Sequence, residues 1–168
     1  YALPGGNIGV YTGLLGVAKT QDQLAAVIGH EIAHVTERHG AERVSQSQLA
    51  SMGMDIAAVA MGQPSPAKDM LYAAMGLGTQ VGLLKFSRTH ESEADYLGLD
   101  LMAKAGFDPR EAVTLWQNMA KASEGAPPEF LSSHPSHETR IGDLNQAMPR
   151  AMEFYNKARS EGKTPKCG

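Results

Sequence analysis

The chain has 168 residues, enough for one folded domain with a sizeable hydrophobic core. Its 42% hydrophobic and 20% charged residues exclude an intrinsically disordered chain, and its net charge of −3 argues against a nucleic-acid partner. The chain begins at Tyr1 without a signal-peptide pattern, so we expect residues 1–168 to be a fragment that forms a single domain and lacks an N-terminal part.

The first predicted elements are a short strand and a long helix. The partly β-branched stretch NIGVYTGLL, residues 7–15, follows the turn PGG, which is typical of a strand. Thr20 and Gln23 have the spacing of a capping box, and apolar residues then recur on one side of a helix over residues 21–44. We therefore expect a small β-sheet near the N-terminus, followed by the first helix.

Residues 45–86 differ in composition from the rest of the chain. They are rich in Gly, Ala and Met, have few charges and contain QPSP in the middle. We expect two helices of small residues joined by a loop near Pro64 and Pro66. Such helices pack against each other, but flexible Met side chains also serve adaptable surfaces. The segment is interpreted as helix–helix packing, or as a mobile cover or a contact surface for a membrane or another subunit.

The C-terminal half is predicted to be helical. Ser87 has the character of an N-cap for a helix over residues 87–106, and a second helix begins at Pro109. A loop over residues 123–137, a helix over residues 138–148 and a last helix that opens at Pro149 follow. The expected fold class is α+β, mostly helical with one small β-sheet near the N-terminus.

The helix over residues 21–44 contains two histidines at a spacing suited to a metal ion. His30 and His34 in HEIAH are four residues apart, so their imidazoles lie on one face and can bind one ion. Glu31 lies beside them, where it can hold a water molecule bound to the metal. The HExxH arrangement predicts a catalytic zinc site.

A third histidine follows but does not fit the same site. His39 lies five residues after His34 and about 140° round the helix, so it points elsewhere. The three-histidine motif of metzincins would need Gly at position 37 and His at position 40, where this chain has Glu37 and Gly40. We interpret His39 as a surface residue or one close to a helix cap.

Catalytic zinc takes three protein ligands, so the third must come from another segment. Glu91 and Asp95 in SRTHESEAD share one helical face, and Glu91 can complete a His₂Glu site while Asp95 accepts the free N–H of a ligand histidine. Glu93 lies on nearly the opposite face. The alternative is that these acidic residues only complement the dipole of a helix start.

The three motifs HEIAH, SRTHESEAD and HPSHETRI together resemble metallopeptidase family 48, a gluzincin family, over residues 2–145. No stretch reaches the roughly 18–20 apolar residues of a membrane span, so the chain is most similar to the periplasmic and lipoprotein branch. The resemblance implies a zincin-like metalloprotease domain with one Zn²⁺ per chain. Its third ligand is the Glu of ExxxD, which corresponds to Glu91 with Asp95. A periplasmic or cell-envelope protease that acts on unfolded or misfolded polypeptides in protein quality control is expected.

In the mechanism that this implies, Glu31 takes a proton from the attacking water and delivers it to the leaving amine. His134 and Arg140 in HPSHETRI are the candidate donors to the oxyanion, and His137 is a weaker alternative. In the resembling family, a histidine here stabilises the transition state or occupies the open coordination position. The alternatives are an ordinary loop histidine at position 134 and a surface ion pair at position 140.

Two further hypotheses remain open from the sequence. The chain could be a zinc-containing chaperone-like or adaptor protein whose site is latched by a fourth ligand such as His134, or a helical scaffold in which the motif is accidental. An intact Glu31 favours the peptidase, because a structural zinc site does not need it. An extended substrate is expected to add as a strand along residues 7–11.

Overall fold

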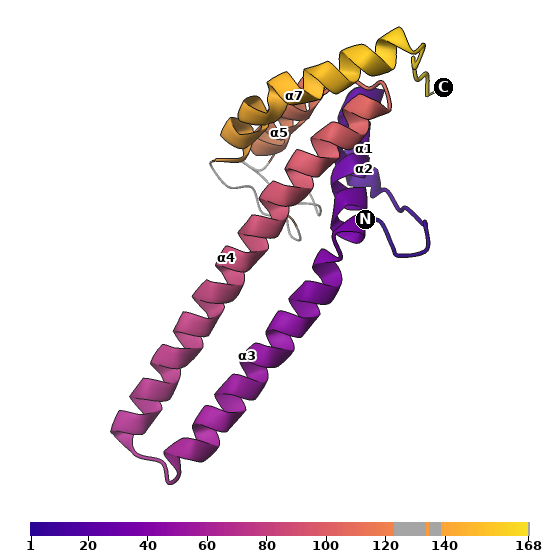
Figure 1. Cartoon of the computed structure of the whole chain (residues 1–168). Helices are drawn as coiled ribbons and strands as arrows, with labels where there is room; N and C mark the ends of the chain where they lie inside the picture. The colour runs from indigo at the N-terminus through magenta and orange to yellow at the C-terminus, as the bar shows by residue number, and fades with distance from the viewer. Residues whose placement is uncertain (123–133, 135–138, 168) are drawn as a thin grey trace. The chain divides into compact units, whose positions relative to one another are not determined.

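The computed structural model describes residues 1–122, 134 and 139–167, and these are almost entirely helical (Figure 1). The helices are α1 (Thr12–Leu15), α2 (Gln21–Thr36), α3 (His39–Met61), α4 (Pro66–Lys104), α5 (Arg110–Ala122) and α7 (Arg140–Ser160). Among the described residues, no helix is both long enough and apolar enough to cross a bilayer.

The expected β-sheet near the N-terminus, and with it the α+β class, is wrong. In the described residues the strand-like pairing is a single isolated antiparallel bridge between Ala2 and Ile8. The two residues are joined by a turn through Gly5 and Gly6, which both have positive φ. No further strand pairs with this bridge, and a lone pair of strands is only marginally stable in water. The chain therefore leaves the bridge and enters α1 at Thr12.

Helix α2 begins as the sequence predicts and ends earlier. The Thr20 hydroxyl accepts a hydrogen bond from the Gln23 backbone N–H at 3.2 Å, which confirms the predicted cap. The helix stops at Thr36 because Arg38 adopts a left-handed conformation with φ of 59°. The prediction of one helix over residues 21–44 is therefore wrong, because a new helix starts at His39.

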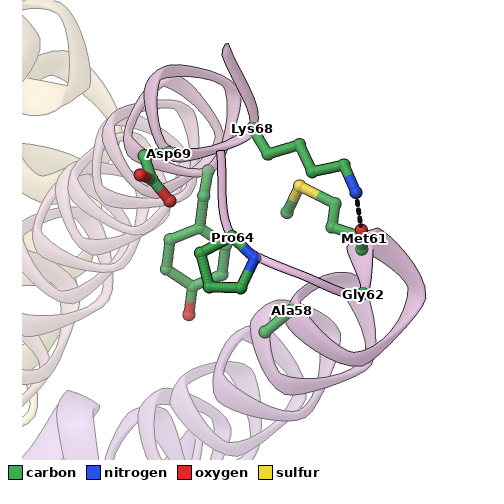
Figure 2. A pocket seen from close by; sticks show the side chains of 7 residues that line it. Ala58, Met61, Gly62, Pro64, Lys68 and Asp69 are labelled. Atoms are coloured by element: carbon green, nitrogen blue, oxygen red, sulfur yellow. Dashed lines mark hydrogen bonds between the residues drawn. The ribbon is translucent and has the colours of Figure 1, made fainter. Parts of the chain in front are cut away.

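The chain comprises two compact units, and the smaller one consists of Arg38–His90. It contains α3 and the first part of α4, joined by a tight connection at Gly62–Ser65, so the two expected helices and their loop near Pro64 are confirmed. Figure 2 shows this connection, where Lys68 Nζ donates to the carbonyl of Met61. It also donates to the carbonyl of Gln63 at 3.1 Å, so a cation caps the end of α3.

Two other predicted boundaries are wrong. Helix α4 runs without a break through Ser87, so Ser87 is no cap, and the small residues before it continue the same helix. Helix α7 runs through Pro149, where a new helix was expected. A proline removes one backbone hydrogen bond, but Ala147 and Ala151 on either side of it are buried, so packing stabilises the helix across this position.

The larger unit consists of Tyr1–Glu37 and Glu91–Gly168, and it holds the hydrophobic core. In it α5 packs against α2 and α7. Apolar side chains from α1, α2, the end of α4, α5 and α7 form one buried cluster. Its largest members are Leu14, Val27, Leu99, Met102, Leu115, Trp116, Met119 and Leu144. This core fixes the two helices that carry the HExxH and ExxxD motifs.

Candidate metal centre

The two histidines of α2 lie together at the surface of the core. His30 and His34 are one helical turn apart, with ring centroids 4.6 Å apart and their Nε2 atoms 3.0 Å apart. His30 is buried, and His34 is partly buried. Both rings therefore present a nitrogen atom to the same point in space.

Helix α4 brings the predicted third group to that point. Glu91 is fully buried, with one carboxylate oxygen 3.4 Å from His30 Nε2 and the other 3.3 Å from His34 Nε2. The structure thus brings together the two histidines and the glutamate that the sequence predicts as ligands, from positions about sixty residues apart in the chain.

The approach of α2 and α4 depends on two glycines that sequence reasoning missed. A Cβ atom at Gly29 would lie 2.7 Å from the Gly98 carbonyl oxygen, and one at Gly98 would lie 2.6 Å from the His30 backbone nitrogen. Backbone therefore packs directly on backbone beside His30. The available signal was a glycine inside each of two long helical patterns, which points to close approach when it lies in a helix interior.

His134 joins the cluster as a fourth member. Its Nδ1 lies 3.0 Å from the nearer Glu91 oxygen and 3.2 Å from His30 Nε2. One ligand atom from each of His30, His34, Glu91 and His134 can be chosen so that all lie within 4.8 Å of one another. Ligands at the corners of a tetrahedron around zinc are about 3.3 Å apart, since Zn–N bonds are about 2.0–2.1 Å. Five separations among the ring nitrogens and carboxylate oxygens of these side chains lie between 3.0 and 3.4 Å, which is the size that such an ion needs.

Asp95 holds the His30 ring in one orientation and one tautomer. Its Oδ1 lies 2.8 Å from His30 Nδ1, one turn of α4 beyond Glu91. The carboxylate accepts the Nδ1–H, which leaves the lone pair of Nε2 directed at the cluster. This is the geometry that the sequence predicts for Asp95.

Arg140, at the start of α7, binds the carboxylates of Asp95 and Glu91. Its Nη2 donates to Asp95 Oδ1 at 2.7 Å, its Nε pairs with the other Asp95 oxygen, and its Nη1 donates to Glu91 at 3.4 Å. The guanidinium stacks on the Trp116 ring at 3.5 Å and is 1% exposed. The interpretation of Arg140 as a surface ion pair is therefore wrong, because the residue is buried against the centre.

The charges of the cluster favour a cation. Burial alone would raise the pKa of Glu31, but the hydrogen bond and charge of His134, with His30, lower it to about 2. Burial likewise opposes ionisation of Glu91, yet hydrogen bonds from His134, His30 and His34 hold its pKa well below the usual range. The same carboxylates outweigh the effect of burial on His134 and raise its pKa to about 9. Two anionic carboxylates thus face the ring nitrogens, and their negative charge favours a bound cation.

The remaining sequence candidates lie elsewhere. His39 is the first residue of α3, directly after the N-cap Arg38, so the predicted position close to a helix cap is confirmed. It is buried and stacked on His90 at 4.1 Å, so the alternative of a surface position is wrong. Glu93 is exposed on α4 and is not in the metal-binding group found among the described residues. His137 lies outside the described residues.

An HExxH helix whose histidines meet a glutamate from a second helix is the arrangement of a metallopeptidase. The model of peptidase family M48 matches residues 1–148. The chain belongs to this family of metalloendopeptidases, which confirms the family predicted from the sequence.

Curated relatives agree with this assignment. The mitochondrial metalloendopeptidase OMA1 of Schizosaccharomyces pombe is 39% identical over 154 residues, which are 90% of this chain and 44% of that protein. OMA1 of Bos taurus is 39% identical over 92% of this chain and 31% of its own length. The beta-barrel assembly-enhancing protease of Escherichia coli K12 is 32% identical over 96% of this chain and 36% of its own length. The chain thus spans less than half of each relative, and no solved structure matches it.

Proposed function

We propose that this chain is a zinc-dependent metalloendopeptidase that hydrolyses peptide bonds of unfolded or misassembled proteins. The observation that carries the proposal is the meeting of His30, His34 and Glu91 at one point, with Glu31 next to them. Two imidazoles and a carboxylate are a donor set that zinc uses in hydrolytic sites. Zinc bound there supplies a Lewis acid that polarises a peptide carbonyl and acidifies water.

Glu31 is the proposed general base. It is buried and ionised, and one of its oxygens lies 3.1 Å from His134 Nε2. It accepts a proton from the attacking water and returns it to the leaving amine. In the metal-free chain Glu31 and Glu91 outweigh the effect of burial and raise the pKa of His134 to about 9, which favours the protonated ring, and a protonated ring can donate to the oxyanion of the substrate. Arg140 is engaged by Asp95 and Glu91, so we assign it to positioning these carboxylates.

Substitution of Glu31 tests this proposal. Glu31→Gln should abolish cleavage of an unfolded protein such as reduced casein and leave the zinc content unchanged, because the residue is not in the ligand set. Glu93→Gln on the exposed face of α4 is the matched control and should change neither. Chelation should stop cleavage by the wild type, and added zinc should restore it. A wild-type protein that holds zinc and cleaves no unfolded substrate would refute turnover as the function.

A specific observation favours a second role, a latched site. His134 Nδ1 lies among the other ligand atoms, where a fourth protein ligand would exclude water. His134→Ala separates the two roles. A rise in cleavage shows that His134 blocks the open coordination position, as expected for an adaptor whose metal site is catalytically inactive. A fall shows that it supports the transition state.

The proposed setting is protein quality control in the cell envelope. The name of the bacterial relative refers to β-barrel assembly, and that of the other relatives to mitochondria. Ile8, Val10 and Tyr11 are all more than 40% exposed beside the Ala2–Ile8 bridge, so this edge can pair with an extended substrate. Main-chain pairing binds many sequences weakly, which suits unfolded substrates.

A further inference from the structure

The smaller unit exposes an unusual amount of apolar surface. We call residues 44–84 of α3 and α4 the apolar hairpin. Most of the exposed large hydrophobic side chains of the described residues lie on it, and Val59 and Met70 are 83% and 76% exposed. The others are Val44, Leu49, Met52, Ile56, Leu71, Tyr72, Met75, Leu77, Val81 and Leu84. Soluble monomers rarely expose a contiguous apolar patch of this extent.

On α3 the exposed apolar residues form a stripe that faces away from α4. Leu49, Met52, Ile56 and Val59 recur at spacings of three and four. The half-buried residues Ala50, Met54, Ala57 and Met61 recur at the same spacing, about 150° round the helix. Of these, Met54 packs against Gly76 of α4, because a Cβ atom added to Gly76 would lie 3.7 Å from the Met54 Cε. One face of α3 therefore packs against α4, and the exposed apolar stripe lies on the opposite face.

Helix α4 repeats the pattern. Four apolar residues are exposed at helical spacing: Met70, Leu77, Val81 and Leu84. On the side of the helix that packs against α3, the half-buried residues include Gly76, Leu83 and Phe86. The hairpin is therefore apolar on both of its outward faces. A two-fold contact between copies covers one patch on each copy and would leave the other face in water. A helix that is apolar on several sides suits lipid better than a single protein partner.

The charges of this unit point to an anionic partner. Residues 44–84 carry only Asp55, Lys68 and Asp69 as charged groups, whereas cations gather where the hairpin begins and ends. All four of these cations are exposed: Arg38, Arg43, Lys85 and Arg88. Within residues 38–43 and 85–90 the one acid is Glu42, which lies 2.9 Å from His90 Nε2.

The unit as a whole differs in charge from the chain. Residues 38–90 contain five Lys and Arg against three Asp and Glu, in a chain whose net charge is −3. A basic end next to exposed apolar helices is the pattern of a segment that binds the interface of an anionic bilayer. There the cations meet lipid phosphates, and apolar side chains enter the boundary of headgroups and acyl chains.

We infer that the apolar hairpin docks on the surface of an anionic lipid bilayer. This contact is independent of peptide hydrolysis, because none of the residues that carry it lies in the metal-binding group. It places a centre for peptide hydrolysis at a membrane, where misassembled envelope proteins are found.

Vesicle flotation tests the inference. The full chain, as the Glu31→Gln variant to prevent self-cleavage, is mixed with vesicles of phosphatidylcholine alone or with added phosphatidylglycerol. Binding should require phosphatidylglycerol and weaken with salt. Arg43→Gln with Arg88→Gln should reduce partitioning about 25-fold, since each basic residue contributes a factor of about five. The matched control, Lys157→Gln with Arg159→Gln on α7, should bind as the parent does.

The apolar contribution needs its own pair of variants. Val59→Gln with Leu77→Gln should weaken vesicle binding several-fold, and the conservative pair Val59→Ile with Leu77→Met should retain it. Circular dichroism checks that each variant remains helical. The inference is overturned if phosphatidylglycerol vesicles do not bind the chain, or if neither the charge nor the apolar pair affects binding. It is also overturned if the chain is oligomeric without lipid, the Gln pair makes it monomeric and no vesicle binds, because the hairpin is then an interface between copies.

Discussion

The crossing of α2 and α4 at Gly98 provides the sharpest structural prediction. A Cβ at position 98 would lie 2.6 Å from the His30 nitrogen, 2.8 Å from the His30 Cα and 2.9 Å from the Gly29 carbonyl carbon. All three atoms are backbone, so no side chain can rotate away. Ordinary contact begins at 3.4 Å, and Gly98→Ala must therefore separate the helices by about 1 Å.

That separation moves Glu91 and Asp95 away from His30, because both lie on α4 within two turns of Gly98. We expect a 10- to 100-fold loss of zinc affinity, the size of effect seen when a group that supports a ligand is lost. Cleavage should fall by about 100-fold, as a misplacement of about 1 Å can cause. Overpacking should lower the free energy of unfolding by about 1–3 kcal/mol. Competition with a chromogenic chelator measures the affinity, and urea unfolding of chelator-treated protein measures the stability.

Two other glycines of α4 provide the control. Gly78 and Gly82 have no atom within 4 Å of an added Cβ, so Ala at either position should leave zinc affinity unchanged. Each should raise stability by up to about 1 kcal/mol through helix propensity. If Gly98→Ala binds zinc as tightly as Gly82→Ala does, the helix crossing does not set the geometry of the centre.

Three further predictions concern the groups around the ligands. Asp95→Asn should weaken zinc binding by about 10- to 100-fold, because an amide no longer fixes the His30 tautomer, and metal titration measures this. Arg140→Met should destabilise the fold by about 3–5 kcal/mol, because it leaves buried carboxylates without their cation, and denaturant unfolding tests it. The raised pKa of His134 and the lowered pKa of Glu31 give chelator-treated protein a pH-dependent stability. The His134 part is full below pH 6.5 and lost as pH rises through about 9, and the Glu31 part is full above pH 4.5 and lost as pH falls through about 2. Thermal unfolding should show this profile, and His134→Ala should flatten its alkaline side.

The motifs predicted more of the site than of the fold. The spacing of His30 and His34 fixes their geometry through the helix alone, and Asp95 follows Glu91 by one turn in the same way. The structure accordingly places His30, His34 and Glu91 together, with Asp95 on His30. Local spacing could not reveal that Arg140 is buried beneath them, because that depends on how α7 packs on the core.

The errors in the fold came from tertiary context. Helical periodicity continues past Thr36, and only the left-handed backbone of Arg38 ends the helix there. Pro149 is normally a sign of a boundary, yet helix α7 continues through it. The β-branched residues near Ile8 favour a strand, but a strand needs partners, and the described residues supply only a bridge.

Zinc content of the Glu91→Gln variant tests the central claim most directly, because this residue supplies the carboxylate from the second helix. Elemental mass spectrometry should find one zinc per chain in the wild-type protein. Glu91→Gln should lose most of its zinc after dialysis, and Glu93→Gln should keep it. Retention of stoichiometric zinc with unchanged affinity in Glu91→Gln would contradict the account.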